Sequence, residues 1–467
     1  MQRRFCFRLF CFILLLLLLS GCEKNAPPPS GAEAPSASEV ANPADAGSDS
    51  LDAPSAEALQ IARALLVEPI GAQVVESHLE ALPIWRSFQS KRPALVLMTL
   101  DPLLWPPPQE LQAELLERIT GFDTAQLQRL TSVKSVDPPI VIPSVVDAAL
   151  RAGWFRELVW VIPAAVSFEE LSLDVLRQQF LERNFLSPAE VAGLERSEYG
   201  FRGMVRGLPF QAVHPSTLPP LSGKVLFHFG VDFFRELYKG EIKSPLYPLL
   251  HEMMVAVREA GWEALAVTVA QGNLGGTLPL ATRFIGADVA RLMANPQWLA
   301  EIPDQWDRRG RALYLDNFFQ NDEIFRLYQA MLKEDPADPS VHYALFQRYR
   351  QRKETAAALQ ELAEAVRLDP IYGLEYLDLA NLALERKAHG KDLEMLQLAA
   401  DAMPENPWLK IDLAKAWLRM GGEGKRHALA LLQELQQLPW SSIYFPEIPP
   451  MLEALQKVAQ SEEGEAS

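Results

Sequence analysis

The chain has 467 residues, of which 49% are hydrophobic and 22% are charged, and these values argue against a wholly disordered or a polytopic membrane protein. Its 60 acidic and 44 basic residues give a net charge of −16, which repels polyanions. The sequence therefore predicts no nucleic-acid partner, and its length predicts about three domain-sized parts.

The first residues predict a targeting signal. Three arginines precede an apolar run at residues 9–19, which is typical of a signal peptide and too short to span a bilayer. The run ends in Leu19-Ser20-Gly21-Cys22. This ending resembles the lipobox of bacterial lipoproteins, which implies a removed signal at residues 1–21 and diacylglycerol and palmitate chains on Cys22. Glu23 after that cysteine implies the outer membrane, facing the periplasm, if the source has one.

Residues 22–56 follow as a segment rich in Ala, Pro and Ser. Between residues 23 and 56 there is no aromatic residue, and Val40 and Leu51 are the only large aliphatic residues. Such a composition cannot bury enough apolar surface to offset the entropy cost of ordering. We expect a disordered tether between the lipid and the folded part.

Residues 57–304 predict an α/β domain. Apolar runs typical of buried strands alternate with helical patterns, and they lie at residues 93–100, 157–162, 224–229 and 263–270. Ser244-Pro245 predicts the start of a helix and Gly261 its end, which makes 224–270 a βαβ unit. We expect a mostly parallel sheet in a three-layer domain.

One segment of this domain, residues 227–234, contains the polar residues of a candidate metal or catalytic site. His228, Gly230 and Asp232 alternate along a strand, so they share one side near its carboxyl end, where parallel sheets bind ligands. The pattern resembles the aspartate-rich metal strand of arginase-like and deacetylase-like hydrolases. That resemblance implies a divalent metal held by Asp101, His228 and Asp232, and hydrolysis of amide or amidine bonds.

The segment also departs from that family. Gly230 stands where a carboxylate is expected, and Asp101 is followed by Pro102 rather than by histidine. A metal site needs about three convergent protein ligands. We therefore favour a degenerate, non-catalytic domain without a cofactor, in which His228 and Asp232 form hydrogen bonds within the sheet. A metal-dependent hydrolase is the alternative.

A repeat occupies the carboxyl-terminal third. Pro336, Pro370 and Pro404 are 34 residues apart, and Pro439 follows after 35. Alanine and leucine recur between them at positions that resemble the tetratricopeptide repeat, or TPR. The resemblance implies helix pairs over residues 305–460, with a weaker first unit at 305–336, a capping helix at 447–460 and a disordered tail at 461–467.

In TPR arrays, four positions of each first helix line the concave surface. The resemblance therefore implies a partner-binding role for Tyr343, Arg350, Leu377, Leu384, Trp408, Ile411 and Leu418. Two interpretations stay open, since these side chains either form a groove for a protein or peptide or pack within the chain. We expect a lipid-anchored envelope protein that binds or scaffolds an unidentified partner.

Overall fold

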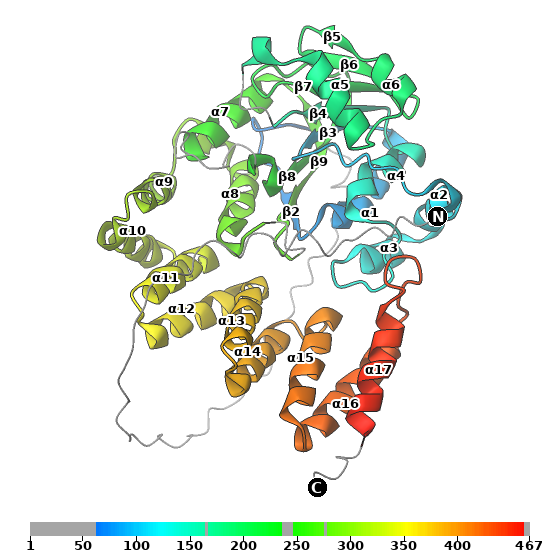
Figure 1. Ribbon diagram of the computed structural model, residues 1–467. Coiled ribbons are helices and arrows are strands. Elements are labelled where there is room, and N and C mark those ends of the chain that lie inside the picture. Colours follow the sequence, from blue (N-terminus) through cyan, green and yellow to red (C-terminus); the bar gives the residue numbers. More distant parts are fainter. Residues whose placement is uncertain (1–61, 164–166, 236–245, 275–277, 462–467) are drawn as a thin grey trace. The chain divides into compact units, whose positions relative to one another are not determined.

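The computed structural model describes residues 62–163, 167–235, 246–274 and 278–461 (Figure 1). The predicted signal peptide, Cys22, the tether, Ser244-Pro245 and residues 462–467 lie outside these ranges. All described residues belong to one compact unit, Pro54–Ser467. No described helix combines the length and the apolar character that crossing a bilayer requires.

A mixed sheet organises the amino-terminal half. Its strands are β1 Arg63–Ala64, β2 Ala72–Val75, β3 Ala94–Met98, β4 Glu157–Val161, β5 Glu195–Ser197, β6 Gly200–Val205, β7 Leu208–Val213, β8 Lys224–Gly230 and β9 Glu263–Ala270. Their order in the described part is β1-β9-β8-β3-β4-β7-β6-β5, and β2 also pairs with β9. Strands β2, β9, β8, β3, β4 and β7 run parallel, whereas β1, β5 and β6 are antiparallel to their neighbours.

The four predicted strands are confirmed as β3, β4, β8 and β9. They read as continuous apolar runs because parallel strands at the centre of a sheet are covered on both faces. The hairpin of β6 and β7 was not predicted. Its two-residue turn is Arg206-Gly207, both with positive φ (52° and 77°), which suits the twist of a hairpin but lacks the more familiar Asn-Gly signal.

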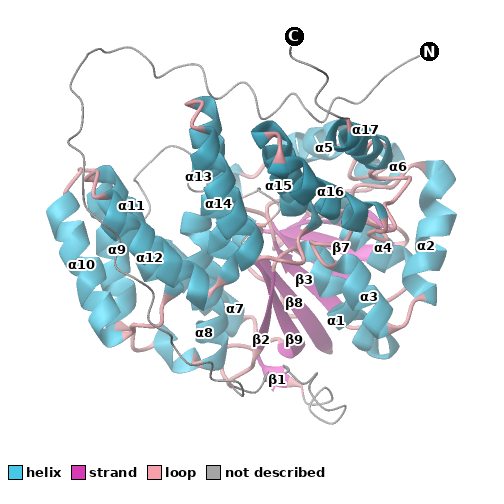
Figure 2. Ribbon diagram, turned by 90° about the horizontal axis from the view of Figure 1, so that it is seen from below, coloured by secondary structure: helices cyan, strands magenta, loops and turns pink. Residues whose placement is uncertain are grey.

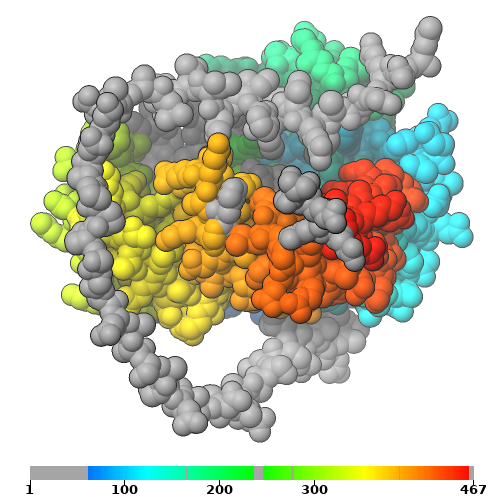
Figure 3. All heavy atoms as spheres, turned by 60° about the horizontal axis from the view of Figure 1, so that its bottom comes forward, coloured from blue at the N-terminus to red at the C-terminus, as the bar shows by residue number. Residues whose placement is uncertain are grey.

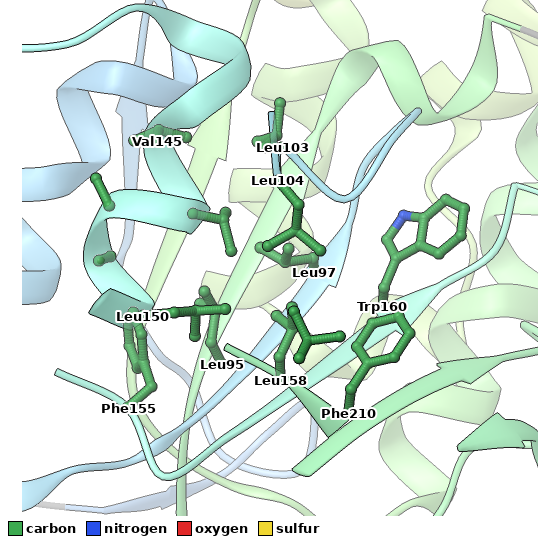
Figure 4. Close-up of a cluster of buried hydrophobic side chains, with 14 of the residues drawn as sticks. Leu95, Leu97, Leu103, Leu104, Val145, Leu150, Phe155, Leu158, Trp160 and Phe210 are labelled. Carbon is green, nitrogen blue, oxygen red and sulfur yellow. The ribbon is translucent and has the colours of Figure 1, made fainter. Parts of the chain in front are cut away.

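Helices cover both faces of the sheet, as Figure 2 shows. They are α1 Leu82–Ser87, α2 Gln112–Gly121, α3 Thr124–Thr131, α4 Val145–Arg151, α5 Leu173–Glu182, α6 Pro188–Ala192, α7 Leu246–Glu259 and α8 Arg283–Ala294. Leu95 and Leu97 of β3 point into a core shared with α1, α4 and α5 (Figure 4). Val96 and Met98 of the same strand point into a second core with α7 and α8. The predicted three-layer arrangement is therefore confirmed.

The carboxyl-terminal part is an array of helices. They are α9 Asp304–Asp316, α10 Asn321–Glu334, α11 Pro339–Gln351, α12 Thr355–Leu368, α13 Leu374–Glu385, α14 His389–Ala402, α15 Pro407–Met420, α16 Glu423–Gln436 and α17 Ile448–Gln460. Consecutive helices pack as pairs from α9 to α16, and α17 packs on α16. In the space-filling view, these helices form a continuous band from yellow-green to red (Figure 3).

The sequence period explains the regularity of the array. The second helices of the four pairs begin 34 residues apart, at Asn321, Thr355, His389 and Glu423. Helices α10, α12 and α14 each end two residues before a periodic proline, which cannot continue a helix. Fully buried alanines such as Ala365, Ala399 and Ala414 let paired helices approach closely. The predicted all-α array is confirmed.

Candidate functional site

Five polar side chains meet at the carboxyl edge of the parallel strands: His78, Asp101, His228, Asp232 and Thr268. We call them the strand-edge cluster. His78 follows β2, Asp101 follows β3, Asp232 follows β8, and His228 and Thr268 lie within β8 and β9. Because these strands are parallel and adjacent, their carboxyl ends share one edge of the sheet. The structure thus brings the three predicted candidates, Asp101, His228 and Asp232, to one region.

His78 joins the members of this cluster. The His228 Nε2 atom lies 2.8 Å from His78 Nδ1, and His78 Nε2 lies 3.4 Å from Asp232 Oδ2. On its other side, His228 Nδ1 lies 2.7 Å from Thr268 Oγ1. His228 forms hydrogen bonds with His78 and Thr268, whereas Asp232 accepts from the Leu100 amide at 3.4 Å and pairs with His78, so His228 and Asp232 do not bond to each other. His78 was not predicted, because β2 is a four-residue strand with no fully buried residue.

Burial and charge set different pKa values for the two histidines. Burial, together with the neighbouring His78, holds the pKa of His228 well below its usual value. Burial also acts to lower the pKa of His78, but the carboxylates of Asp232 and Asp101 outweigh it and raise that pKa. When His78 is protonated, it donates from Nδ1 to His228 Nε2, so His228 must donate from Nδ1 to Thr268.

The cluster leaves no room for the carboxylate that a metal strand carries at position 230. A Cβ atom on Gly230 would overlap Asp232 and lie 2.6 Å from His78 Cε1. Within the described ranges, no three His, Cys, Asp or Glu side chains are grouped so that they could hold a metal ion. The described chain therefore lacks, and has no space for, the carboxylate that the hydrolase resemblance requires at position 230.

Arg283, the first residue of α8, ties the strand edge to the helical array. Its guanidinium donates to both carboxylate oxygens of Glu76, at 2.8 and 2.6 Å, immediately after β2. The same group forms an ion pair with Asp369, between α12 and α13, and lies 3.4 Å from Asn273 after β9. One buried side chain thus connects two strand ends to the junction of two helix pairs.

A second polar network joins α8 to the first two helix pairs. Arg309 of α9 is buried and donates to Asp338 at 2.8 Å and to Ser340 at 2.6 Å, both at the start of α11. Arg291 of α8 reaches both Asp338, at 3.8 Å, and Asp288, at 3.4 Å. Arg309, Asp338 and Asp288 are almost fully removed from water, so each depends on its partners, whereas the Arg291 side chain is 37% exposed.

The far end of the array also contacts the α/β part. The backbone amide of Ser441, between α16 and α17, donates to the carbonyl of Val136 at 2.9 Å. The Lys134 ammonium lies 3.5 Å from the carboxylate of Glu405, just before α15. The array is therefore held at both ends (Figure 1).

The predicted partner-binding residues fall into two groups. Tyr343 and Ile411 are buried, and Tyr343 donates to Glu375 at 2.6 Å. Trp408 packs against Trp440 and Phe445, with ring centroids 5.2 and 4.9 Å apart. These three side chains lie within the array, as the packing interpretation describes.

The other predicted residues keep contact with solvent. Half of the Arg350 side chain is exposed, although it pairs with Glu375 at 2.8 Å. Leu384 is exposed, and Leu377 and Leu418 are partly buried. Asp378 and Asn381, one turn apart on α13, are exposed beside Leu377. An open surface of mixed polarity therefore remains on α11 and α13, and we call it the inner face.

Comparisons with known proteins add little to this description. No family model matches the chain, and no curated protein matches it. Among solved structures, it is similar to a thermophilic TPR protein from Thermus thermophilus. The identity is 19%, the match covers 38% of this chain and 89% of that chain, and the TM-score is 0.20. The array is defined by its own helices and by their 34-residue spacing.

Proposed function

We propose that this is a lipid-anchored protein of the cell envelope whose helical array binds a polypeptide partner, while its α/β part acts as a non-catalytic support. The observation that carries the proposal is the inner face. It is a surface of α11 and α13 where leucines, a carboxylate, an amide and a guanidinium stay in contact with solvent although the helices around them are packed.

The chemistry of the inner face suits a peptide. Leu377 and Leu384 offer apolar contacts, whereas Arg350, Asp378 and Asn381 offer hydrogen bonds to backbone and side-chain groups. Groove-binding peptides combine both kinds of contact, with apolar anchors at the centre and polar groups at the rim.

The attachment of the array favours binding over mere packing. Arg291 of α8 pairs with Asp338 near the first end of the array, Arg283 pairs with Asp369 between α12 and α13, and Ser441 contacts Val136 near the last end. A surface that is fixed before binding loses less conformational entropy when a partner arrives. The α/β part thus supports the array without supplying chemistry of its own, in keeping with a strand-edge cluster whose histidines bond to each other.

Site-specific crosslinking in cells tests this surface. With a photoreactive amino acid at Leu377 or at Asn381, we expect a defined crosslinked species, because both positions lie on the inner face. Leu398 of α14 is the matched control, since its side chain is 39% exposed but belongs to the second helix of the pair. Equal crosslinking at Leu398 and at Leu377 would contradict the proposal.

The lipid anchor has a separate test. The Cys22→Ala variant is expected to incorporate no labelled fatty acid and to remain an uncleaved precursor, because the thiol that accepts the diacylglycerol is missing. Metabolic labelling followed by immunoprecipitation measures both effects. Unchanged incorporation in the variant would exclude Cys22 as the lipidated residue. That result would not contradict the proposal that the inner face binds a polypeptide.

A further inference from the structure

The turns inside the four helix pairs lie at one edge of the array. They connect α9 to α10, α11 to α12, α13 to α14 and α15 to α16. Because short turns join antiparallel neighbours and the pairs pack in sequence, the first helices of the pairs share a direction. Their carboxyl ends therefore meet at one edge. We call it the turn edge, and it comprises residues 316–323, 351–354, 385–391 and 419–426.

The opposite edge of the array faces the α/β part. The ion pairs that join Asp338, Asp369 and Glu405 to the α/β part all lie at connections between pairs, and so does the bond from Ser441 to Val136. A helix of 14 residues, such as α10, is about 21 Å long. The turn edge lies at the far ends of these helices and points away from the α/β part.

Bulky apolar side chains project from two of the turns. Phe319 is 83% exposed, and Tyr314, Phe318 and Met420 are about half exposed. The rings of Tyr314 and Phe318 lie against each other, with centroids 5.1 Å apart. An exposed patch of this kind marks a surface that contacts a partner or a membrane.

The backbone of the turns repeats with the same period as the helices. Phe319, Lys353, Lys387 and Gly421 are 34 residues apart, and their φ angles are 57°, 64°, 58° and 65°. Glycine adopts positive φ without strain, yet three of these four positions hold phenylalanine or lysine. The turns thus carry a large apolar or a basic side chain where glycine would be less strained.

The last three turns carry more positive than negative charge. Residues 351–354, 385–391 and 419–426 contain eight basic and three acidic side chains. Three of the basic side chains are neutralised by ion pairs, namely Arg352 with Asp322, Arg419 with Asp392 and Arg426 with Glu423. The five that pair with no carboxylate in the described part of the chain are Lys353, Arg386, Lys387, Lys391 and Lys425.

A surplus of positive charge remains when the nearby acids are considered. Glu354 and Glu385 are the two acidic side chains of these turns without an ion pair among the described residues, so five cations face two anions. In the first turn, Asp316 pairs with Arg348 and Glu323 with Arg311. The turn edge thus has a surplus of three positive charges, although the whole chain has a net charge of −16.

The helix dipole does not explain all of these cations. Arg386 and Lys387 follow the carboxyl end of α13, where a positive charge is favourable. Lys391 and Lys425, however, lie in the first turns of α14 and α16, where the dipole disfavours a cation. A role outside the helices accounts for both positions.

We propose that the turn edge lies on the surface of a bilayer that contains anionic phospholipids. The phosphate groups pair with Lys353, Arg386 and Lys387, and the rings of Phe318 and Phe319 enter the boundary between headgroups and acyl chains. An acidic polypeptide would pair with the lysines but leave the exposed rings in water, so the combination favours a membrane. This inference goes beyond the lipid anchor proposed at Cys22, because it names the face of the folded part that meets the bilayer and does not require lipidation.

Fluorescence quenching in vesicles tests the proposal. Gln320→Cys places a fluorophore beside Phe319, and Ala337→Cys places one at the other end of α10, where the array faces the α/β part. Both positions are exposed, so they form a matched pair. The wild-type chain, labelled in parallel, gives the background from its own cysteines. The full chain is reconstituted in vesicles of phosphatidylcholine, with or without phosphatidylglycerol, that contain quenching brominated lipids.

In vesicles with phosphatidylglycerol, the label at position 320 is expected to be quenched at least about threefold more than the label at position 337. The difference should disappear at about 1 M salt, where the Debye length falls to about 3 Å. A lipid anchor would hold the chain to both kinds of vesicle, so dependence on phosphatidylglycerol and salt separates the two contacts.

Three results would overturn the proposal. They are equal quenching at the two positions, equal quenching at position 320 with and without phosphatidylglycerol, and a response of that label to poly-L-glutamate but not to the vesicles. The last result would assign the turn edge to an acidic polypeptide.

Charge variants assign the contact to the turn edge. Each basic residue near an anionic surface contributes about fivefold, so the double variant Arg386→Gln and Lys387→Gln should lower the equilibrium constant for contact at least about tenfold. That constant is the ratio of quenched to unquenched label at position 320. Arg129→Gln with Lys333→Gln is the control, because both side chains are exposed away from the turn edge. The control should behave like the wild type.

The apolar part has its own variant. Phe319→Asn removes the ring, and asparagine tolerates positive φ, so the turn and the melting temperature should be preserved. We expect the equilibrium constant for contact to fall at least about threefold. Unchanged contact in both the double charge variant and Phe319→Asn would exclude the turn edge as the membrane surface.

Discussion

The Arg309→Gln variant is expected to lose about 3 kcal/mol of unfolding free energy, because it leaves buried carboxylates without their counter-charge. Arg309 and Asp338 are 5% and 4% exposed at their side chains, so water cannot replace the lost partner. Arg291, at 3.8 Å, is too distant to compensate fully. Urea denaturation followed by circular dichroism measures the effect.

The same helix provides a control. Arg311 of α9 pairs with Glu323, but its side chain is 59% exposed, so the Arg311→Gln variant should change stability by less than about 1 kcal/mol. Equal losses in the two variants would show that the buried network contributes no more than a surface ion pair.

The effect of Arg309→Gln should also depend on pH. Burial acts to raise the pKa of Asp338, but Arg309, Ser340 and Arg291 lower it overall. A lowered pKa stabilises the folded state above the unfolded-state value of about 3.9, and that contribution disappears as the pH falls through the folded-state pKa. The difference between wild type and variant is therefore expected to be largest near neutral pH and to shrink in acid.

The Trp408→Ala variant is expected to lose about 3 kcal/mol of stability, because it removes an indole from the end of the array. Trp408 packs against Trp440 and Phe445, which belong to the segment between α16 and α17. Ser441 of the same segment donates to the carbonyl of Val136. Thermal melts monitored by circular dichroism test this, and helix content at low temperature should be preserved.

Trp105 is the matched control for Trp408. It is 40% exposed in a loop after β3, so Trp105→Ala should leave the melting temperature nearly unchanged. If Trp408→Ala melted like the wild type but abolished the crosslink at Leu377, Trp408 would be a partner contact rather than a packing residue.

The sequence by itself was enough to predict the regular parts of the fold. The strands β3, β4, β8 and β9 are continuous apolar runs, and the helix pairs follow a 34-residue period punctuated by prolines. Both signals can be recognised within a few residues of the sequence. A strand covered on both faces is a continuous apolar run, and a proline ends a helix because it lacks a backbone N–H. The chemistry of Asp101, His228 and Asp232 was also visible as residue types at strand ends.

Only the tertiary structure decided how these parts meet. His78 and His228 are 150 positions apart, and Arg283 reaches Glu76 across 207 positions. No periodicity in the chain encodes such pairs, because they arise from strand order and from the packing of the array on α8. Trp408 is a further example. Its position in the repeat was compatible with a binding groove and with internal packing, and the structure shows that the segment after α16 covers it. A side chain's position on a helix follows from local spacing, but its burial depends on which distant segment packs against it.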